Sequence, residues 1–167
     1  MIETERLIIR PLTYDQLKKH LYSPDELAVE LQIIPSKDGI DDATREAIIH
    51  DFLPHLEDSD KDFRFYTMWI VIEKSSRKLA GGICFHGEAN EDGEVEIGYG
   101  TVIECRNKGI MTETISGMIQ WLKGNRIAKT IKAETDRENI SSIKALEKNN
   151  FKVFQENDKM IIFKLQL

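Results

Sequence analysis

Residues 94–114 read EVEIGYGTVIECRNKGIMTET, and the change of pattern inside this stretch decides the fold. Its first part, Glu94–Val102, is typical of a strand with a side-chain period of two. A short polar loop follows, and from Ile110 to Leu122 apolar residues recur at helical spacing until Gly124-Asn125 ends the helix. Lys129–Thr135 is the next strand. We therefore expect a strand–helix–strand crossover whose two strands lie parallel.

The sequence around this unit predicts further strands that pair antiparallel with their neighbours. Met68–Ile72 is continuously apolar, as expected of a strand covered on both faces, and short turns join it to Leu79–His86 and then to Glu94–Val102. The other expected elements are a strand Leu7–Arg10, a helix after a cap at Thr13 or Ser23, a helix begun by Pro24, a helix Ala43–Leu53 ended near Pro54, a helix Asn139–Asn149, and strands Phe151–Phe154 and Met160–Leu165. The pattern predicts a mixed α/β sheet.

Composition narrows the classes of function. The 167 residues predict one domain over residues 1–167. With 23 basic and 29 acidic side chains the net charge is −6, which disfavours nucleic acid and anionic membranes as partners. The N-terminus begins with charge, and no apolar run approaches the roughly 20 residues of a membrane span, so we expect a cytoplasmic protein.

The residues of the types that often bind metals or react with substrates predict ordinary structural roles here. Cys84 and Cys105 lie far apart and predict two reduced thiols. The 4 histidines are scattered, without metal-ligand spacing, so no metal is expected. We interpret Trp69, His86 and Tyr99 as strand or core packing.

The loop before the long helix is the strongest local signal of a ligand site. The N-terminus of a helix exposes unpaired N–H groups and the positive end of the helix dipole, which suit phosphate. Arg106 and Lys108 add positive charge, and Gly109 allows close approach of the backbone. The alternative is a tight turn with solvated basic side chains. A nucleotide-binding P-loop is disfavoured, because its Lys-Ser/Thr pair is missing, and a dinucleotide loop lacks its third glycine.

Four segments, in order along the chain, resemble the GNAT N-acetyltransferases, and within them the branch that acetylates the N-termini of ribosomal proteins. The segments are Thr4–Pro11, Glu96-Ile97-Gly98-Tyr99, Arg106–Met111, and Asn139-x-x-Ser142-x-x-x-Leu146-Glu147-Lys148-x-x-Phe151. The sequence departs from the family at Met111, where Gly or Ala is usual, and residues 33–65 match no motif. The resemblance implies a twisted, mostly antiparallel sheet with one parallel crossover, flanked by helices.

The resemblance also implies acetyl-CoA as cosubstrate. Loop amides from Asn107 to Thr112 would hold its diphosphate, and one strand edge would run beside its pantetheine arm. An N–H near Thr101 or Val102 would polarise the thioester carbonyl. The expected cofactor-binding residues are Gly100, Thr101, Val102, Arg106, Asn107, Lys108, Gly109, Ile110, Met111, Thr112 and Asn139.

The implied reaction is direct transfer of an acetyl group to an amine, without a covalent enzyme intermediate. Glu96 is the leading candidate for the general base, ahead of Glu94, and an ion pair on the sheet is the alternative role of Glu96. Many members of the family use a Tyr in this helix to give the departing thiolate a proton or a hydrogen bond, but no Tyr occurs between Asn139 and Leu167. The resemblance to the ribosomal-protein branch implies that Ser142, at the motif position, takes this role. Its alternative role is a local hydrogen bond, and Asn139 is expected to cap its helix.

A second interpretation keeps the same loop but drops the chemistry. It is a non-catalytic acyl-CoA-binding module that acts as a sensor or partner domain. The acceptor is left open between a protein N-terminus, a polyamine, an amino acid and an aminoglycoside, and a homodimer is left open as well.

Overall fold

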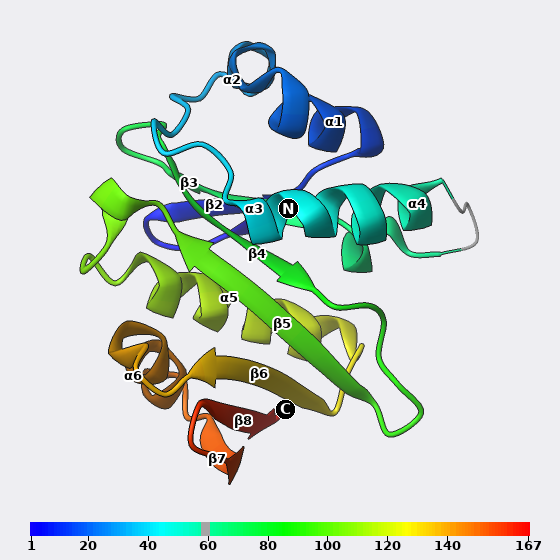
Figure 1. The fold of residues 1–167 in the computed structure, drawn as a ribbon, viewed down its shortest axis with the longest axis vertical. Coiled ribbons are helices and arrows are strands. Elements are labelled where there is room, and N and C mark those ends of the chain that lie inside the picture. The colour runs from blue at the N-terminus through cyan, green and yellow to red at the C-terminus, as the bar shows by residue number, and fades with distance from the viewer. Residues whose placement is uncertain (58–60) are drawn as a thin grey trace.

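The computed structural model describes residues 1–57 and 61–167, and an eight-stranded sheet runs through it in the order β1-β2-β3-β4-β5-β6-β8-β7 (Figure 1). Strands β5 and β6 pair in parallel, and every other neighbouring pair is antiparallel. The predicted mixed sheet with one parallel crossover is confirmed. The strands are β1 (Ile2–Glu3), β2 (Leu7–Pro11), β3 (Met68–Glu73), β4 (Leu79–Phe85), β5 (Glu94–Thr101), β6 (Thr130–Asp136), β7 (Lys152–Glu156) and β8 (Met160–Gln166).

Helices cover both faces of the sheet. The helices are α1 (Tyr14–Tyr22), α2 (Pro24–Leu31), α3 (Asp42–Ala47), α4 (Leu53–Leu56), α5 (Ile110–Asn125) and α6 (Ile140–Lys148), with a π-helical turn η1 (Ile48–Phe52) and 3-10 turns η2 (Phe63–Phe65) and η3 (Ile103–Cys105). Strand β3 shows the layering, because Trp69 and Val71 join the core under α5 and α6, while Ile70 and Ile72 join the core under α1, α2 and η1. All four are buried, as predicted for a strand covered on both faces.

The helical run over residues 42–56 differs from the prediction at its end. Pro54 was expected to stop the helix, yet the chain stays helical to Leu56. Just before the proline the helix widens into η1, where the N–H of Leu53 donates to the carbonyl of Ile48. A proline inside an α-helix clashes with the preceding turn, and a wider turn relieves that clash, so the helix passes Pro54.

Several local predictions are confirmed. Thr13 caps α1 in a reciprocal capping box with Gln16. Cys84 and Cys105 are free thiols. Trp69 is fully buried and packs against Trp121 with ring centroids 5.0 Å apart.

Within the described part of the chain, no helix is long and apolar enough to cross a membrane.

Candidate active site

The sheet opens between its two parallel strands. Pairing of β5 with β6 covers only Glu94–Ile97 against Thr130–Ala133. Beyond this point Gly98–Thr101 pairs with β4 alone, and Glu134–Asp136 pairs with β8 alone. Figure 1 shows the two strands adjacent at their starts and separated at their ends, where α5 begins and α6 lies alongside. We call the opening between Gly98–Thr101 and Glu134–Asp136 the notch.

The register of β5 decides which peptide groups face the notch. The N–H of Val102 donates to the carbonyl of Ala80 at 3.0 Å, and the carbonyl of Glu96 accepts from the N–H of His86 at 3.0 Å. Backbone groups of an antiparallel strand alternate between its two edges, so Tyr99 and Thr101 direct theirs away from β4. The expectation of a thioester contact from Val102 N–H is therefore wrong, because that group belongs to the sheet. Of the two predicted donors, Thr101 and Val102, it is Thr101 whose N–H faces the notch.

The loop that leads into α5 exposes backbone amides. Asn107 and Gly109 both have left-handed backbone angles, with φ of 60° and 72°. None of the described side chains caps α5, and its first helical hydrogen bond runs from the N–H of Glu113 to the carbonyl of Gly109 at 3.1 Å. The N–H groups of Ile110–Thr112 precede that bond and lie at the positive end of a helix of 16 residues. This turn has the features of an anion site.

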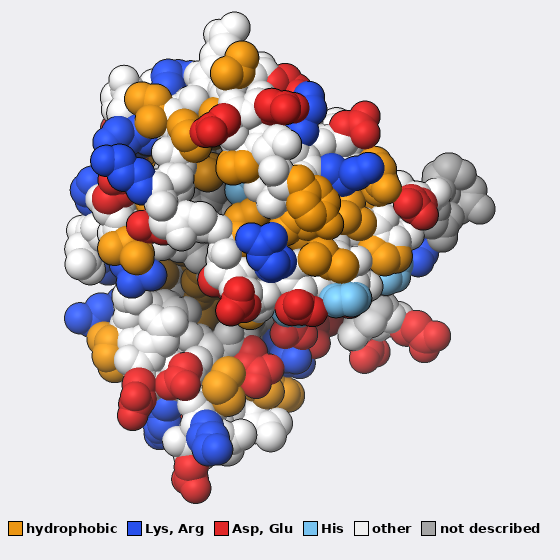
Figure 2. All heavy atoms as spheres, turned by 45° about the horizontal axis from the view of Figure 1, so that its top comes forward, with side chains coloured by type: hydrophobic (Ala, Val, Ile, Leu, Met, Phe, Trp, Pro, Cys, Tyr) orange, Lys and Arg blue, Asp and Glu red, His pale blue; other side chains and the backbone are white. Residues whose placement is uncertain are grey.

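The side chains of this loop and of the start of α5 are of two kinds, exposed charged ones and buried apolar ones. Arg106 and Lys108 are exposed, and Arg106 Nε donates to the carbonyl of Thr101 at 3.4 Å. Ile110 and Met111 are buried in the core under α5, so only their backbone is left to meet a ligand. The large side chain at Met111 therefore does not obstruct the loop. Figure 2 shows Lys and Arg side chains along the edge of the molecule where this loop lies, beside a hollow.

Glu96 lies on the face of the sheet that helices α1–α4 cover over other strands. Its carboxylate accepts from Lys132 Nζ at 2.9 Å, and Glu96 Oε1 lies 4.0 Å from His86 Nδ1. A Cβ on the neighbouring Gly98 would lie 2.8 Å from His86 Nε2, so a side chain there would require the His86 ring to move. His86 is 55% exposed, so it is not a core residue, and its packing is against the neighbouring strand alone. Its ring lies over Gly98 at the apex of the notch.

Ser142 and Tyr99 meet on the opposite face. Tyr99 Oη and Ser142 Oγ form a hydrogen bond of 2.8 Å between β5 and α6. Burial raises the pKa of Tyr99 to about 12, which the hydrogen bond from Ser142 only partly offsets, so the phenol keeps its proton at neutral pH. Asn139 caps α6 as predicted, since its Oδ1 accepts from the N–H of Ser142 at 3.1 Å. The sequence predicted Ser142 but not its partner.

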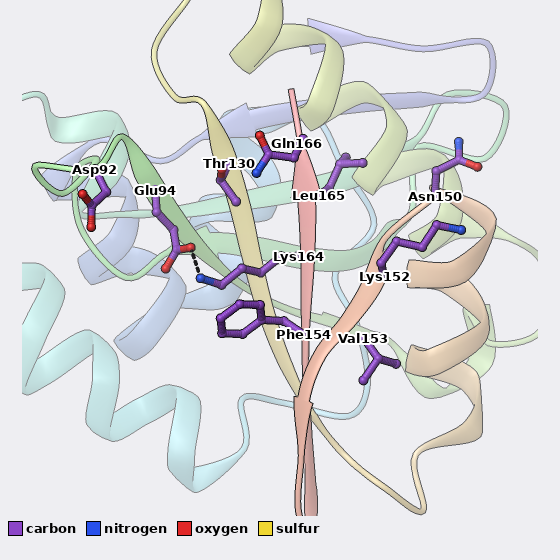
Figure 3. Close-up of a pocket in the computed structure, with 10 residues that line it drawn as sticks. All are labelled: Asp92, Glu94, Thr130, Asn150, Lys152, Val153, Phe154, Lys164, Leu165 and Gln166. Carbon is purple, nitrogen blue, oxygen red and sulfur yellow. Dashed lines mark ion pairs between the residues drawn. The ribbon is translucent and has the colours of Figure 1, made fainter.

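A separate surface pocket lies at the other end of the parallel pair. Figure 3 shows Glu94 reaching from β5 to Lys164 on β8 beside Phe154, with the two charges 2.6 Å apart. Glu94 is thus held in an ion pair away from the apex of the notch. The pocket is lined by Asp92, Glu94, Thr130, Asn150, Lys152, Val153, Phe154, Lys164, Leu165 and Gln166. Among the described residues, no group of His, Cys, Asp and Glu side chains could hold a metal ion.

Known proteins share this fold. An acetyltransferase of the GNAT family from Bacillus anthracis superposes with a TM-score of 0.67 at 19% identity, covering 99% of this chain and 97% of that one. A ribosomal L7/L12 alpha-N-protein acetyltransferase in complex with coenzyme A gives a TM-score of 0.66 at 13% identity, covering 98% and 96%. At these identities the likeness concerns the fold.

Sequence comparison supports the same assignment. The uncharacterized N-acetyltransferase YjdG of Bacillus subtilis (strain 168) is 33% identical over 86 residues, which is 52% of this chain and 51% of that protein. The match thus spans about half the length of this curated relative. The family model described as an acetyltransferase (GNAT) domain matches residues 6–152, which include the notch, the loop before α5 and α6. The chain therefore belongs to the GNAT acetyltransferase family.

Proposed function

We propose that this protein is an N-acetyltransferase that moves an acetyl group from acetyl-CoA directly to a primary amine. The observation that carries the proposal is the notch, where an unpaired strand edge leads to an uncapped helix N-terminus. A strand edge can pair with the amide groups of a pantetheine arm, and bare helix amides can bind a diphosphate. The proposed site thus matches the two chemically distinct parts of one cosubstrate.

The proposed contacts follow from which groups the fold leaves available. The amides from Asn107 to Thr112 hold the diphosphate, with Arg106 and Lys108 adding positive charge. Backbone groups of Tyr99 face the notch and pair with the arm, and the N–H of Thr101, which faces the same way, is left for the thioester. Gly100 shares that part of the strand, and no other group comes within 4 Å of a Cβ built on it, so its bare surface leaves space beside the arm. Asn139 stands at the start of α6 near the same opening, and we propose a contact from its exposed side to the arm.

The proposed chemistry uses groups on both faces of the sheet. The amine nitrogen attacks the thioester carbon, a C–N bond forms, the C–S bond breaks, and the thiolate departs. Glu96 takes the proton that the amine loses, directly or through water, and Thr101 N–H stabilises the developing oxyanion. Ser142 donates a hydrogen bond to the thiolate from the other face, and the thiol takes its proton from water. The ion pair with Lys132 holds the Glu96 carboxylate in place.

The acceptor is proposed only as a class. A protein N-terminus and a small-molecule amine both present a primary amine to the Glu96 face. A panel of peptides, polyamines, amino acids and aminoglycosides, read by release of free thiol from acetyl-CoA, would identify it. Cytoplasmic location and a homodimer stay predictions.

Two measurements test the proposal. Calorimetry should detect CoA binding, and at least one amine should accelerate thiol release. Glu96→Gln should lower kcat by about hundredfold or more, in the range for lost general base catalysis, without changing the CoA dissociation constant. Glu94→Gln is the matched control, because Glu94 has the same face and also an ion pair, and it should leave kcat unchanged. Tight CoA binding without thiol release for any amine would favour the sensor module instead.

A further inference from the structure

The N-terminal segment Thr4–Arg6 lies against the loop before α5, although more than a hundred residues separate them in sequence. Both carboxylate oxygens of Glu113, in the first turn of α5, are engaged by this segment. Thr4 Oγ1 donates to Oε1 at 2.6 Å, the N–H of Arg6 donates to the same oxygen at 2.8 Å, and Arg6 Nε donates to Oε2 at 2.6 Å. Arg6 Nη1 also donates to the carbonyl of Lys108 at 3.0 Å. One side chain therefore bridges the loop and the helix.

The bond to Lys108 fixes the direction of a peptide group. In a trans peptide the C=O and the following N–H point in opposite directions. Because the carbonyl of Lys108 is held toward Arg6, the N–H of Gly109 points away from Arg6, toward the outer side of the loop. Gly109 is also left-handed, so the turn needs this external support to keep one orientation of the peptide.

The ion pair removes a charge conflict. A carboxylate in the first turn of a helix competes with any anion that the helix amides would bind. Here the guanidinium of Arg6 lies on the Glu113 carboxylate, and the local charge is neutralised. Loss of Arg6 would leave an unpaired negative charge one turn from the proposed diphosphate.

We infer that Arg6 is a positioning residue of the diphosphate loop, which it orients through Lys108 and shields from Glu113. The inference rests on the proposed function, since it assumes that the loop binds the diphosphate of CoA. It also gives a role to the N-terminal motif, which the proposed chemistry does not use. Arg6 touches the loop and not the reacting atoms.

The test compares two arginines with matched surroundings. Arg137 is 45% exposed against 46% for Arg6, pairs with Glu156 at 2.9 Å and donates to the carbonyl of Asn157 at 2.9 Å, so these partners lie in β7 and the turn after it and not in the loop. Arg6→Ala should weaken CoA binding about tenfold by calorimetry, as expected for lost charge-assisted contacts. Arg137→Ala should bind CoA as the parent protein does. Equal CoA affinity in both variants would overturn the inference.

Two further measurements separate positioning from folding. With an accepted amine, Arg6→Ala should raise KM for acetyl-CoA with kcat nearly unchanged, and its kcat/KM for S-acetylpantetheine, which lacks the diphosphate, should equal that of the parent. Equal losses with both donors would show a general structural role and contradict the inference. Adding Glu113→Gln to Arg6→Ala should recover part of the CoA affinity, and no recovery would contradict the shielding. Failure of the parent protein to bind CoA would contradict the proposed function itself.

Discussion

Helices α5 and α6 both begin beside the notch, but their N-termini are built differently. Asn139 caps α6 and satisfies the N–H of Ser142. Gly109 begins α5 with no side chain to offer, and the first-turn amides stay open. A capped terminus fixes side chains in place, whereas an uncapped one binds an external anion. The difference suggests a division of labour: α5 supplies affinity for the cosubstrate, and α6 supplies a positioned hydroxyl for the reaction.

The strongest way to break this comparison is to give α5 an anionic cap. Gly109→Asp would place a carboxylate among the first-turn amides, where it competes with a diphosphate. We expect CoA affinity to fall by about hundredfold or more, roughly 2.8 kcal/mol, in calorimetry. Gly109→Asn is the control, because Asn tolerates the left-handed backbone without charge and should lose much less. Equal CoA affinity for the Asp variant and the parent would show that the diphosphate binds elsewhere.

Removing the hydroxyl on α6 tests the other half of the comparison. Ser142→Ala should lower kcat roughly tenfold, less than the about hundredfold low end for acid–base catalysis because the Tyr99 hydroxyl stays nearby, while CoA affinity is unchanged. Ser141→Ala is the matched control, since that exposed hydroxyl donates to Asn139 Oδ1 at the N-cap of α6. An unchanged kcat for Ser142→Ala would return Ser142 to the role of a local hydrogen-bonding group.

Removing the cap of α6 links stability to catalysis. Asn139→Ala should lower the free energy of unfolding by about 1 kcal/mol in urea denaturation and also reduce kcat, because the N–H of Ser142 loses its anchor. Thr13→Ala removes the cap of α1, whose side chain accepts from Gln16 N–H at 3.3 Å. It should cost similar stability and leave kcat unchanged. Similar kcat values for the two variants would show that the cap of α6 has no special role.

The smallest expected effect is a pH dependence at the start of α5. Burial raises the pKa of Glu113, but hydrogen bonds from Thr4 and Arg6 outweigh burial and lower it overall. A carboxyl with a lowered pKa stabilises the fold above its unfolded pKa, near about 4.3, and this contribution is lost as pH falls. Glu113→Gln should therefore flatten the acid side of the stability curve by a few tenths of a kcal/mol, roughly, since Arg6 is half open to water. A parallel shift at every pH would contradict this origin.

Local patterns in the sequence were sufficient for most of the fold and half of the site. The cap at Asn139 and the turn before Ile110 depend on neighbours a few residues apart, and the parallel crossover depends on the order strand, helix, strand; all three are confirmed. The course of the chain past Pro54 was missed, because a π-helical turn has no clear signature in residue types.

Contacts between side chains on different strands and helices could not be predicted from the sequence. Lys132 faces Glu96 through the parallel register, and Tyr99 reaches Ser142 because α6 packs on the sheet face that carries Tyr99. Val102 was proposed for a ligand contact that its register gives to Ala80. A one-residue change of register reverses the direction of every group on a strand, and nothing within the strand itself fixes that choice.

The sequence by itself determined where a tight turn before a helix, a capped helix and a crossover would form, since these depend on local backbone geometry and on the order of the elements. Only the tertiary structure decided that Thr4–Arg6 would lie against the start of α5, that the parallel strands would separate after Ile97, and that Glu96 and Ser142 would lie on opposite faces of one opening. The physical reason is that pairing between distant segments is set by strand register and helix packing, which are properties of the whole folded chain.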